Sequence, residues 1–285
     1  MRQIQIQKPG GLENLKLENV DSPNLANDEV LMKIHASSLN YHDLMVALGL
    51  IPTDDKRVPL SDGAGEILEV GSDVTGWKIG DKVMSVCFPN WVDGPPKYEL
   101  LSFIGDNEDG YAAEVIAIKE TALTKIPDNL SFSEAATLPC AGLTAWRALV
   151  DEGNLKKDET VLVQGTGGVS IFALQLAKCI GAIVIARSSS EEKLAKLSSQ
   201  RDTETLGRET SEKIILPPEW MPFFNFMPLQ QNQFCQLTDR FFEGMDKATK
   251  SGNEIKVNMV HKERQENFDG LLPGGEINNW IFTFF

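Results

Sequence analysis

Apolar and polar residues alternate along short segments of the first 125 residues, as they do in half-buried β-strands. Residues 2–7 and 29–36 show this alternation, and strand character returns at residues 112–118. Between them, residues 61–86 contain short apolar stretches that are interrupted by glycines. Such glycines suit the tight corners of a small barrel. The pattern therefore predicts a β-barrel domain over residues 1–125.

The pattern changes to helix-forming composition over residues 126–158, and then to one strand, helix, strand unit. Residues 159–164 and 182–186 are almost entirely apolar, which is typical of buried parallel strands. Between them lies a glycine-rich turn at residues 165–168, followed by a helix that we expect Gly181 to end. This unit predicts an α/β fold. The residues on the predicted apolar face of its helix are Val169, Phe172, Ala173, Leu176 and Ile180.

The pattern stops after about Ser199, and the composition shifts. Ten of the 14 phenylalanines lie after residue 200, whereas all three tyrosines precede it. No further alternation of strands and helices is visible, so only two strands of a parallel sheet are predicted. A sheet of two strands leaves an exposed edge and an uncovered apolar face. We therefore interpret residues 201–285 as a divergent tail that packs poorly.

Charge and cysteine content narrow the range of partners and locations. The 285 residues carry a formal net charge of −14, and an acidic surface disfavours nucleic acid and anionic membranes. We therefore expect a small-molecule partner, with no nucleic acid and no membrane. The first residues contain no apolar segment of a secretory signal, and the four cysteines form no Cys-x-x-Cys pair. A cytoplasmic location is the expectation.

The glycine-rich turn is the strongest candidate for chemistry. The pyrophosphate of a dinucleotide binds bare backbone N–H groups at a helix N-terminus, where the helix dipole also favours an anion. Glycines allow the backbone to turn sharply and to approach the phosphates closely. The alternative is an ordinary tight turn between a strand and a helix. The candidate cofactor-binding residues of the turn are Gly165, Thr166, Gly167, Gly168 and Val169.

The end of the second apolar strand indicates which dinucleotide binds. Proteins that bind NAD usually carry an acidic residue there, which holds the ribose hydroxyls. This chain instead has Arg187, Ser188 and Ser189, followed by Lys193. Positive side chains and hydroxyls suit the additional 2′-phosphate of NADP, so NADP(H) is the predicted cofactor. An alternative role for Ser189 is a capping box with Glu192, and the two roles are compatible.

Several segments resemble the medium-chain dehydrogenase/reductase superfamily, close to its zinc-type alcohol dehydrogenase-like and quinone oxidoreductase-like members. The resemblance covers residues 1–199. It implies a GroES-like catalytic β-barrel domain at residues 1–125, the start of a truncated or aberrant Rossmann domain at residues 126–200, and an active site between them. Members of this family often form dimers, so a homodimer is an expectation. The segments are SLNYHDLMV, PLSDGAGEILEVGSDVTGWKIGDKV, GYAAEV, IPDNLSFSEAATLPCAGLTAWRAL and ETVLVQGTGGVSIFALQLAKCIGAIVIARSSSEEKL.

The resemblance also locates the positions at which zinc-dependent members hold their metal. Those members have Cys where this chain has Asn40 and His where it has Ser61, and a third Cys corresponds to Cys140. One soft ligand of three cannot hold a zinc ion. We therefore expect no metal site, and we interpret Cys140 as a small buried hydrophobic residue.

Without zinc, no Lewis acid polarises a substrate oxygen, and the zinc-free members resemble reductases that use NADPH. The implied function is an NADP-dependent oxidoreductase that transfers hydride between NADPH and a small carbonyl, alcohol, quinone or enone. The candidate catalytic residues are Asn40, Tyr41 and Asp43, and Thr144 corresponds to a position near the nicotinamide. We expect Asn40 to hydrogen-bond the substrate oxygen, and Tyr41 to line the pocket or donate a proton.

Two alternatives stay open at this point. The unrecognisable second half of the Rossmann domain favours a catalytically impaired remnant of the family, which binds a nucleotide or a partner without turnover. At the level of single residues, Tyr41 is alternatively an ordinary loop aromatic, and His42 is interpreted as a surface imidazole.

Overall fold

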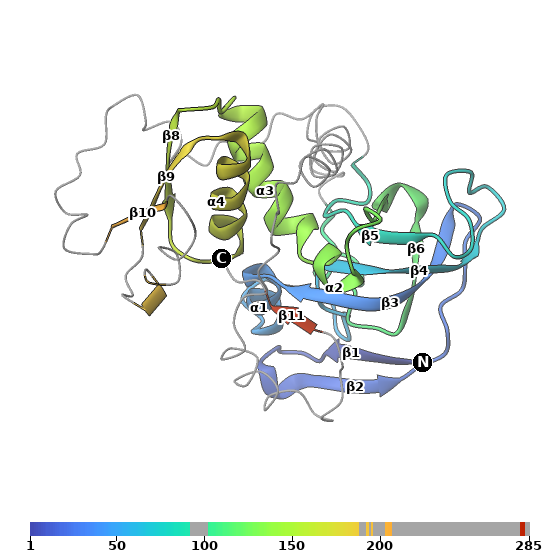
Figure 1. Ribbon diagram of the computed structural model, residues 1–285. Coiled ribbons are helices and arrows are strands. Elements are labelled where there is room, and N and C mark those ends of the chain that lie inside the picture. Colours follow the sequence, from blue (N-terminus) through green and yellow to red (C-terminus); the bar gives the residue numbers. More distant parts are fainter. Residues whose placement is uncertain (92–101, 188–191, 194, 196–202, 207–279, 283–285) are drawn as a thin grey trace. The chain divides into compact units, whose positions relative to one another are not determined.

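The computed structural model describes residues 1–91, 102–187, 192–193, 195, 203–206 and 280–282 (Figure 1). Its described residues form two units, which are considered separately below. The first contains residues 1–140 together with the strand at 280–282, and the second contains the described residues from Ala141 to Leu206. Most of the expected tail, with Ser188 and Ser189, lies outside the described residues. Its packing and the sequence-based domain boundaries therefore stay predictions.

The first unit is built on a six-stranded sheet and a separate two-stranded one (Figure 1). The larger sheet has the order β11-β3-β4-β5-β7, with β6 also paired to β3. Its pairs are antiparallel except for β11, which lies parallel to β3. The strands are β1 (Arg2–Ile6), β2 (Leu15–Asn19), β3 (Glu29–Leu39), β4 (Asp62–Val70), β5 (Lys82–Ser85), β6 (Val115–Lys119), β7 (Leu123–Lys125) and β11 (Trp280–Phe282).

The predicted strands are confirmed at β1, β3 and β6, and the predicted alternation of buried positions is seen in β1 and in the first residues of β3. In β3, Val30 and Met32 are completely buried, and they pack against Ile67 and Val83 of neighbouring strands. Strand β4 approaches β3 closely at Gly65, where a Cβ atom would lie 1.9 Å from the backbone oxygen of Lys33. A glycine is therefore required at this point, because any side chain would push the two strands apart.

Short helices connect these strands. Helix α1 directly follows β3, and α2 begins with a capping box in which Ser131 and Glu134 bond each other's backbone N–H groups. Within the described part of the chain, no helix has the length and apolar character needed to cross a membrane. The helices of this unit are η1 (Leu12–Asn14), α1 (Tyr41–Ala47), η3 (Glu120–Ala122) and α2 (Phe132–Ala135).

The second unit contains the predicted strand, helix, strand unit, and its three strands are all parallel. Their order is β10-β9-β8, which is the order of the first three strands of a Rossmann sheet. The expectation of only two strands is wrong, because β10 extends the sheet beyond β9. The elements are α3 (Leu143–Trp146), β8 (Thr160–Gln164), α4 (Gly168–Ile180), β9 (Ile183–Arg187) and β10 (Thr203–Leu206), with a π-helical turn at Arg147–Glu152. Another π-helical turn, Leu138–Gly142, begins in the first unit and ends in the second.

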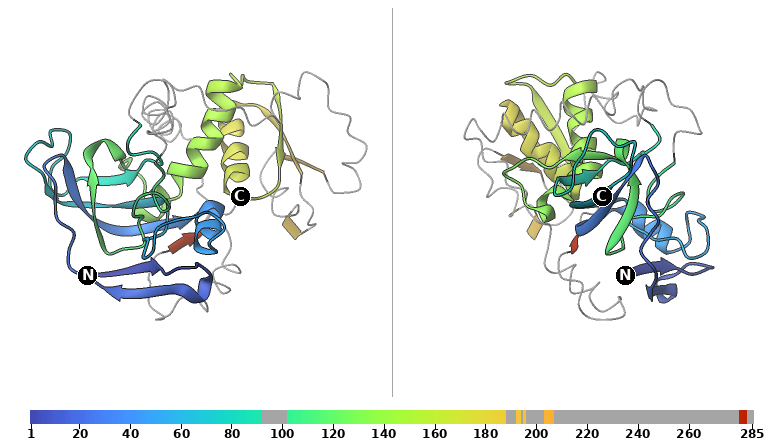
Figure 2. Two further views of the ribbon diagram at one scale, coloured as in Figure 1. Left: turned by 180° about the vertical axis from the view of Figure 1, so that it is seen from behind. Right: turned by 90° about the vertical axis from the view of Figure 1, so that its right-hand side faces the viewer.

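Helix α4 packs against β8 and β9, as Figure 2 shows. It ends at Gly181, which has the left-handed conformation expected of a C-terminal glycine (φ +89°). The predicted apolar face is only partly correct. Phe172 and Leu176 are buried as expected, but Leu174 and Ala177 are completely or almost completely buried as well. The helix therefore buries a wider face than the narrow stripe that the spacing predicted.

Candidate active site

Three of the predicted site residues lie at the start of α1, and the structure gives them different surroundings. Asn40 is the N-cap residue and is buried, whereas Tyr41 begins the helix and is 48% exposed. Asp43 is buried one turn into the helix. Its carboxylate accepts the backbone N–H of Asn40 at 2.7 Å and that of Ser61 at 2.9 Å. Asp43 therefore holds the start of α1 against the segment that leads into β4.

A completely buried carboxyl, that of Asp62, lies at the centre of a polar cluster beside this helix end. Its Oδ2 atom accepts hydrogen bonds from the hydroxyl of Ser38 at 2.9 Å, from the side-chain amide of Asn40 at 3.0 Å, and from the backbone N–H of Cys140 at 3.4 Å. The other amide contact of Asn40 is to the Oγ atom of Ser61, at 3.1 Å. The cluster therefore joins residues from β3, β4 and the start of the π-helical turn.

These contacts bring together the three positions at which zinc-dependent members of the resembling family hold metal. Asn40, Ser61 and Cys140 all lie around Asp62, and they offer one amide, one hydroxyl and one thiol. Zinc sites are built from thiolate, imidazole and carboxylate ligands. In the described part of the chain, no three His, Cys, Asp or Glu residues are grouped so as to hold a metal ion. The donor set does not fit zinc, and metal content stays a prediction.

Burial dominates the electrostatics of this cluster. Loss of hydration is the main effect that raises the pKa of Asp62, and the nearby carboxyl of Asp43 adds to it. The hydrogen bonds from Asn40 and Ser38 oppose these effects, and the resulting pKa is about 7. Burial likewise raises the pKa of Asp43 to about 6, although the N–H groups that it accepts act in the opposite direction. The pKa of the Cys140 thiol is raised by its hydrogen bond with Cys87 and by burial. Every shift favours the uncharged form.

Two atoms of the cluster have unmet hydrogen-bonding capacity. The buried Oδ1 atom of Asp62 has no hydrogen-bond partner among the described residues, and that of Asn40 makes no hydrogen bond of standard geometry among them. Sequence reasoning did not include Asp62 among the site residues. The available signal was its position beside Ser61 in an otherwise small and apolar segment, where a carboxyl would have to be buried.

His42 lies beside this cluster but has a different environment. Its Nε2 atom is 3.0 Å from Oδ2 of Asp106, and its ring meets the edge of Phe103 at a centroid distance of 4.4 Å. The side chain is 28% exposed. The interpretation of His42 as a free surface imidazole is therefore wrong, because the residue is paired and packed against the loop that contains Asp106.

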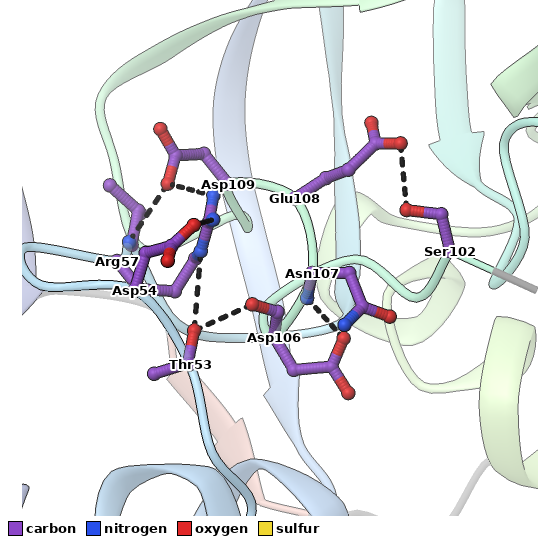
Figure 3. Close-up of polar contacts among 9 residues, drawn as sticks. Thr53, Asp54, Arg57, Ser102, Asp106, Asn107, Glu108 and Asp109 are labelled. Carbon is purple, nitrogen blue, oxygen red and sulfur yellow. Dashed lines mark hydrogen bonds and ion pairs between the residues drawn. The ribbon is translucent and has the colours of Figure 1, made fainter.

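That loop is fixed by a second polar cluster, which Figure 3 shows. Arg57 lies 3.0 Å from the carboxylate of Asp54 and 2.9 Å from that of Asp109. The hydroxyl of Thr53 donates to the backbone oxygen of Asp106 at 2.6 Å. The positive charge of Arg57 balances the negative charges of Asp54 and Asp109. The cluster therefore holds the segment with Thr53 and Arg57 against the loop that contains Asp106 and Asp109.

The predicted cofactor turn has the geometry that a phosphate group needs. Gly165 adopts a left-handed conformation (φ +85°), and a Cβ atom there would meet only the Oγ atom of Ser170, at 3.8 Å. Gly167 is the N-cap residue of α4 and supplies no side-chain cap, so the first N–H groups of the helix receive no bond from it. Thr166 and Val169 flank it in partly buried positions. These residues fit a dinucleotide pyrophosphate.

Three of the five remaining cofactor-binding candidates lie among the described residues. Thr144 lies half-buried in α3, which packs against α4. Arg187 is the last residue of β9 and Lys193 lies in a helical segment, whereas Ser188 and Ser189 lie outside the described residues. The structure therefore brings the glycine turn and α3 into one unit, and the choice between NADP and NAD stays a prediction.

Comparisons with known proteins agree with this architecture. Residues 26–128 match the alcohol dehydrogenase GroES-like domain. A zinc-type alcohol dehydrogenase-like protein of Schizosaccharomyces pombe is 43% identical over 74% of this chain and 61% of its own length. An acryloyl-coenzyme A reductase of Sulfurisphaera tokodaii is 35% identical over 72% of this chain and 64% of its own. A 2-methylene-furan-3-one reductase of Solanum lycopersicum is 37% identical over 67% of this chain and 47% of its own length. The chain thus spans less than two thirds of each.

Solved structures of alcohol dehydrogenases and quinone oxidoreductases have a similar fold. A putative alcohol dehydrogenase from Sinorhizobium meliloti superimposes with a TM-score of 0.72 at 26% identity, covering 87% of this chain and 90% of its own. A quinone oxidoreductase from Coxiella burnetii superimposes with a TM-score of 0.63 at 29% identity, covering 76% of this chain and 66% of its own.

Proposed function

The chain belongs to the medium-chain dehydrogenase/reductase superfamily, and from this premise we propose that it is an NADPH-dependent reductase without catalytic zinc. The substrate is a small carbonyl, quinone or enone, or an alcohol in the reverse direction. Similar proteins are called reductases of an acryloyl thioester and of a methylene furanone, both of which contain an activated alkene. We include a cytoplasmic location and a homodimer in the proposal.

The observation that carries the proposal is the turn from β8 to α4. Its left-handed glycine, its N-cap without a side chain and the adjoining parallel strands form a site for the pyrophosphate of a dinucleotide. The positive charges of Arg187 and Lys193 support NADPH over NADH, because the 2′-phosphate adds negative charge at the end of β9. NADPH, when bound, supplies hydride, and the protein supplies orientation.

The role of each side chain at the start of α1 follows from the hydrogen-bond donors and acceptors that are not already engaged within the protein. Both amide hydrogens of Asn40 are engaged, by Ser61 and Asp62, so in this proposal Asn40 positions the helix start and does not contact the substrate. Tyr41 is exposed at the first position of the helix, and its hydroxyl hydrogen-bonds the substrate oxygen and donates the proton that a reduced carbonyl needs. Asp43 has both oxygens engaged by backbone N–H groups, and it is also a positioning residue.

Titration with NADPH and, in parallel, with NADH tests the cofactor, with nucleotide fluorescence as the readout. We expect saturable NADPH binding that Arg187→Ala weakens about tenfold or more, with a much smaller effect on NADH. Arg2→Ala is the matched control, because it removes an exposed arginine of the first unit whose ion-pair partner among the described residues is Glu114. Equal effects of the two substitutions would contradict a 2′-phosphate contact.

A second candidate is the nucleotide-binding remnant without turnover. It is favoured by one observation: the residue pattern of the family stops at about Ser199, so the second half of a Rossmann domain is not recognisable in this sequence. A turnover assay with quinones and enals separates the two functions. Stoichiometric NADPH binding without any oxidation of NADPH would support the remnant, whereas oxidation that Tyr41→Phe lowers would support the reductase.

A further inference from the structure

The cluster around Asp62 contains two buried acceptor atoms with unused hydrogen-bonding capacity. Asp62 Oδ1 has no hydrogen-bond partner among the described residues. Asn40 Oδ1 makes no hydrogen bond of standard geometry among them either, but the capping box of α1 directs it at the backbone N–H of Asp43, which leaves it a second lone pair. A buried polar atom without a partner costs the free energy of its lost hydration, and an ionised carboxylate costs far more. These two atoms belong to side chains that hydrogen-bond each other. They therefore indicate that the cluster contains a proton that an ionised Asp62 would lack.

The donors that reach Asp62 are all directed at its Oδ2 atom, and the backbone N–H of Asp43 is directed at the Asn40 side chain. The amide hydrogens of Asn40 are directed at Ser61 Oγ and Asp62 Oδ2, and the hydroxyl of Ser38 and the N–H of Cys140 are also directed at Asp62 Oδ2. Rotating the Asn40 amide by half a turn does not help, because its oxygen would then face Asp62 Oδ2, a second acceptor. A proton on the carboxyl is needed in either orientation.

The charges around Asp62 argue for the same proton. The titratable groups that interact with Asp62 are Asp43, Cys140 and Tyr111, and none of them carries a positive charge. His42 acts on Asp43 and is paired with Asp106. An ionised Asp62 would thus be a buried charge without a counter-charge among the described groups, which proteins avoid by binding a proton.

We propose that Asp62 is held as a neutral carboxylic acid that donates a hydrogen bond from Oδ1 to Oδ1 of Asn40. The existing bond from Asn40 Nδ2 to Asp62 Oδ2 closes the second half of a two-bond acid–amide pair. Because Asn40 is the N-cap of α1, this pair fixes the start of the helix and with it Tyr41. Asp62 is therefore a positioning residue. Only the role of Tyr41 rests on the proposed function.

Asp62→Asn is the informative substitution, because an amide reproduces a neutral carboxylic acid in shape and in having one donor and one acceptor group. The full chain is unfolded by heat between about pH 5 and about pH 8, alongside Asp128→Asn as the matched control. Asp128 is 96% exposed, so its substitution removes a charge without touching the cluster.

We expect the wild-type midpoint temperature to fall as the pH rises through this range, since the folded state must then release a proton that it prefers to keep. We expect D62N to match D128N at about pH 5 and to lose less stability by about pH 8, with the remaining dependence due to Asp43. A D62N midpoint that is lowered equally at both pH values would overturn the proposal, because it would show that the carboxylate charge itself is required.

Infrared spectroscopy of the wild-type chain provides a test that needs no variant. A protonated carboxyl has a carbonyl stretch that is resolved from those of ionised carboxylates and of the backbone. We expect this band at about pH 6, with a contribution from Asp43, and we expect the part due to Asp62 to be lost last, as the pH passes about 7. Absence of the band at about pH 6 would overturn the proposal even if D62N did not fold.

Turnover separates the two proposals from each other. If the proposed function holds, D62N lacks the decline in activity that the wild type shows above about pH 7, when each protein is compared with its own activity at about pH 6. A chain without NADPH binding, but with the expected infrared band and unfolding profiles, would contradict the proposed function alone. A chain that turns over without the band would contradict the acid–amide pair alone.

Discussion

The carboxylate of Asp43 accepts the backbone N–H of Ser61, 18 residues further along the chain, at 2.9 Å. The same carboxylate accepts the N–H of Asn40, its own N-cap residue, so one buried side chain closes a helix start and fixes the beginning of β4. This contact determines where Asn40 and Asp62 meet. The geometry of the candidate site is thus set by a residue that has no oxygen left for a substrate.

Asp43→Asn should therefore destabilise the chain without abolishing its fold. An amide can accept only one of the two N–H groups and directs its own N–H₂ group at the other, which leaves a buried donor unsatisfied. We expect a loss of about 1–3 kcal/mol in the free energy of unfolding, measured by chemical denaturation. Asp21→Asn, at an exposed position, is the control. Equal stability of the two variants would show that the Asp43 contacts contribute little.

The stability of the wild-type chain should decrease between about pH 4 and about pH 7. The pKa values of Asp62 and Asp43 are raised in the folded state, to about 7 and about 6, from 3.8. The folded chain then binds more protons than the unfolded one, so stability is fully present below the unfolded pKa and is lost as the pH rises through the folded values. The change is on the order of a few kcal/mol. A rise in unfolding free energy over this interval would contradict the assignment.

Gly65→Ala should disrupt the sheet of the first unit. Its Cβ atom would lie 1.9 Å from the backbone oxygen of Lys33, which cannot yield without breaking the β3–β4 ladder. We expect a loss of roughly 3 kcal/mol or more, or a failure to fold. Gly76→Ala serves as the control, because a Cβ atom there meets only the end of the Glu120 side chain, at 3.3 Å. Comparable stability of the two variants would exclude a close approach at Gly65.

Gly167→Asp should separate stability from cofactor binding. Gly167 has extended backbone angles (φ −76°, ψ 177°) that an N-cap aspartate adopts readily, so the variant should be at least as stable as the wild type. Its charge would occupy the anion position at the N-terminus of α4, and we expect NADPH binding to weaken at least about tenfold. Gly167→Asn is the matched neutral cap and should lose less affinity. Unchanged binding in both variants would place the phosphates elsewhere.

The fold was predictable where the residue pattern was local and regular. Val30 and Met32 in β3, and the apolar segments at β8 and β9, indicated their own burial. Strand β10 was not predictable, because its sequence, Thr-Glu-Thr-Leu, has polar residues at three of four positions. It joins the sheet through pairing with β9, which is a long-range property that four residues do not encode.

The candidate site likewise combines features that the local sequence predicts with features that only long-range contacts create. The glycine turn between β8 and α4 was predictable from the sequence, because a strand, a glycine-rich turn and a helix form a short contiguous motif. Phosphate binding at this turn stays a prediction. The Asp62 cluster was not predictable, since it combines residues separated by 22 to 78 positions, and only the folded chain brings them together. The resemblance identified Asn40, Ser61 and Cys140 as related positions. It did not indicate that a buried carboxyl would lie at their centre.

Strand β9 lies between β8 and β10, and the backbone of Arg187 is paired on both sides, with Gln164 and with Leu206. The position of this residue is therefore set by main-chain bonds that do not depend on which side chain it carries. If Arg187 selects NADPH as proposed, a single substitution at this position can change the cofactor preference while the fold is retained. In evolutionary terms, the proposed role of residue 187 would then allow descendants of this chain to exchange one nicotinamide pool for the other without rebuilding the domain.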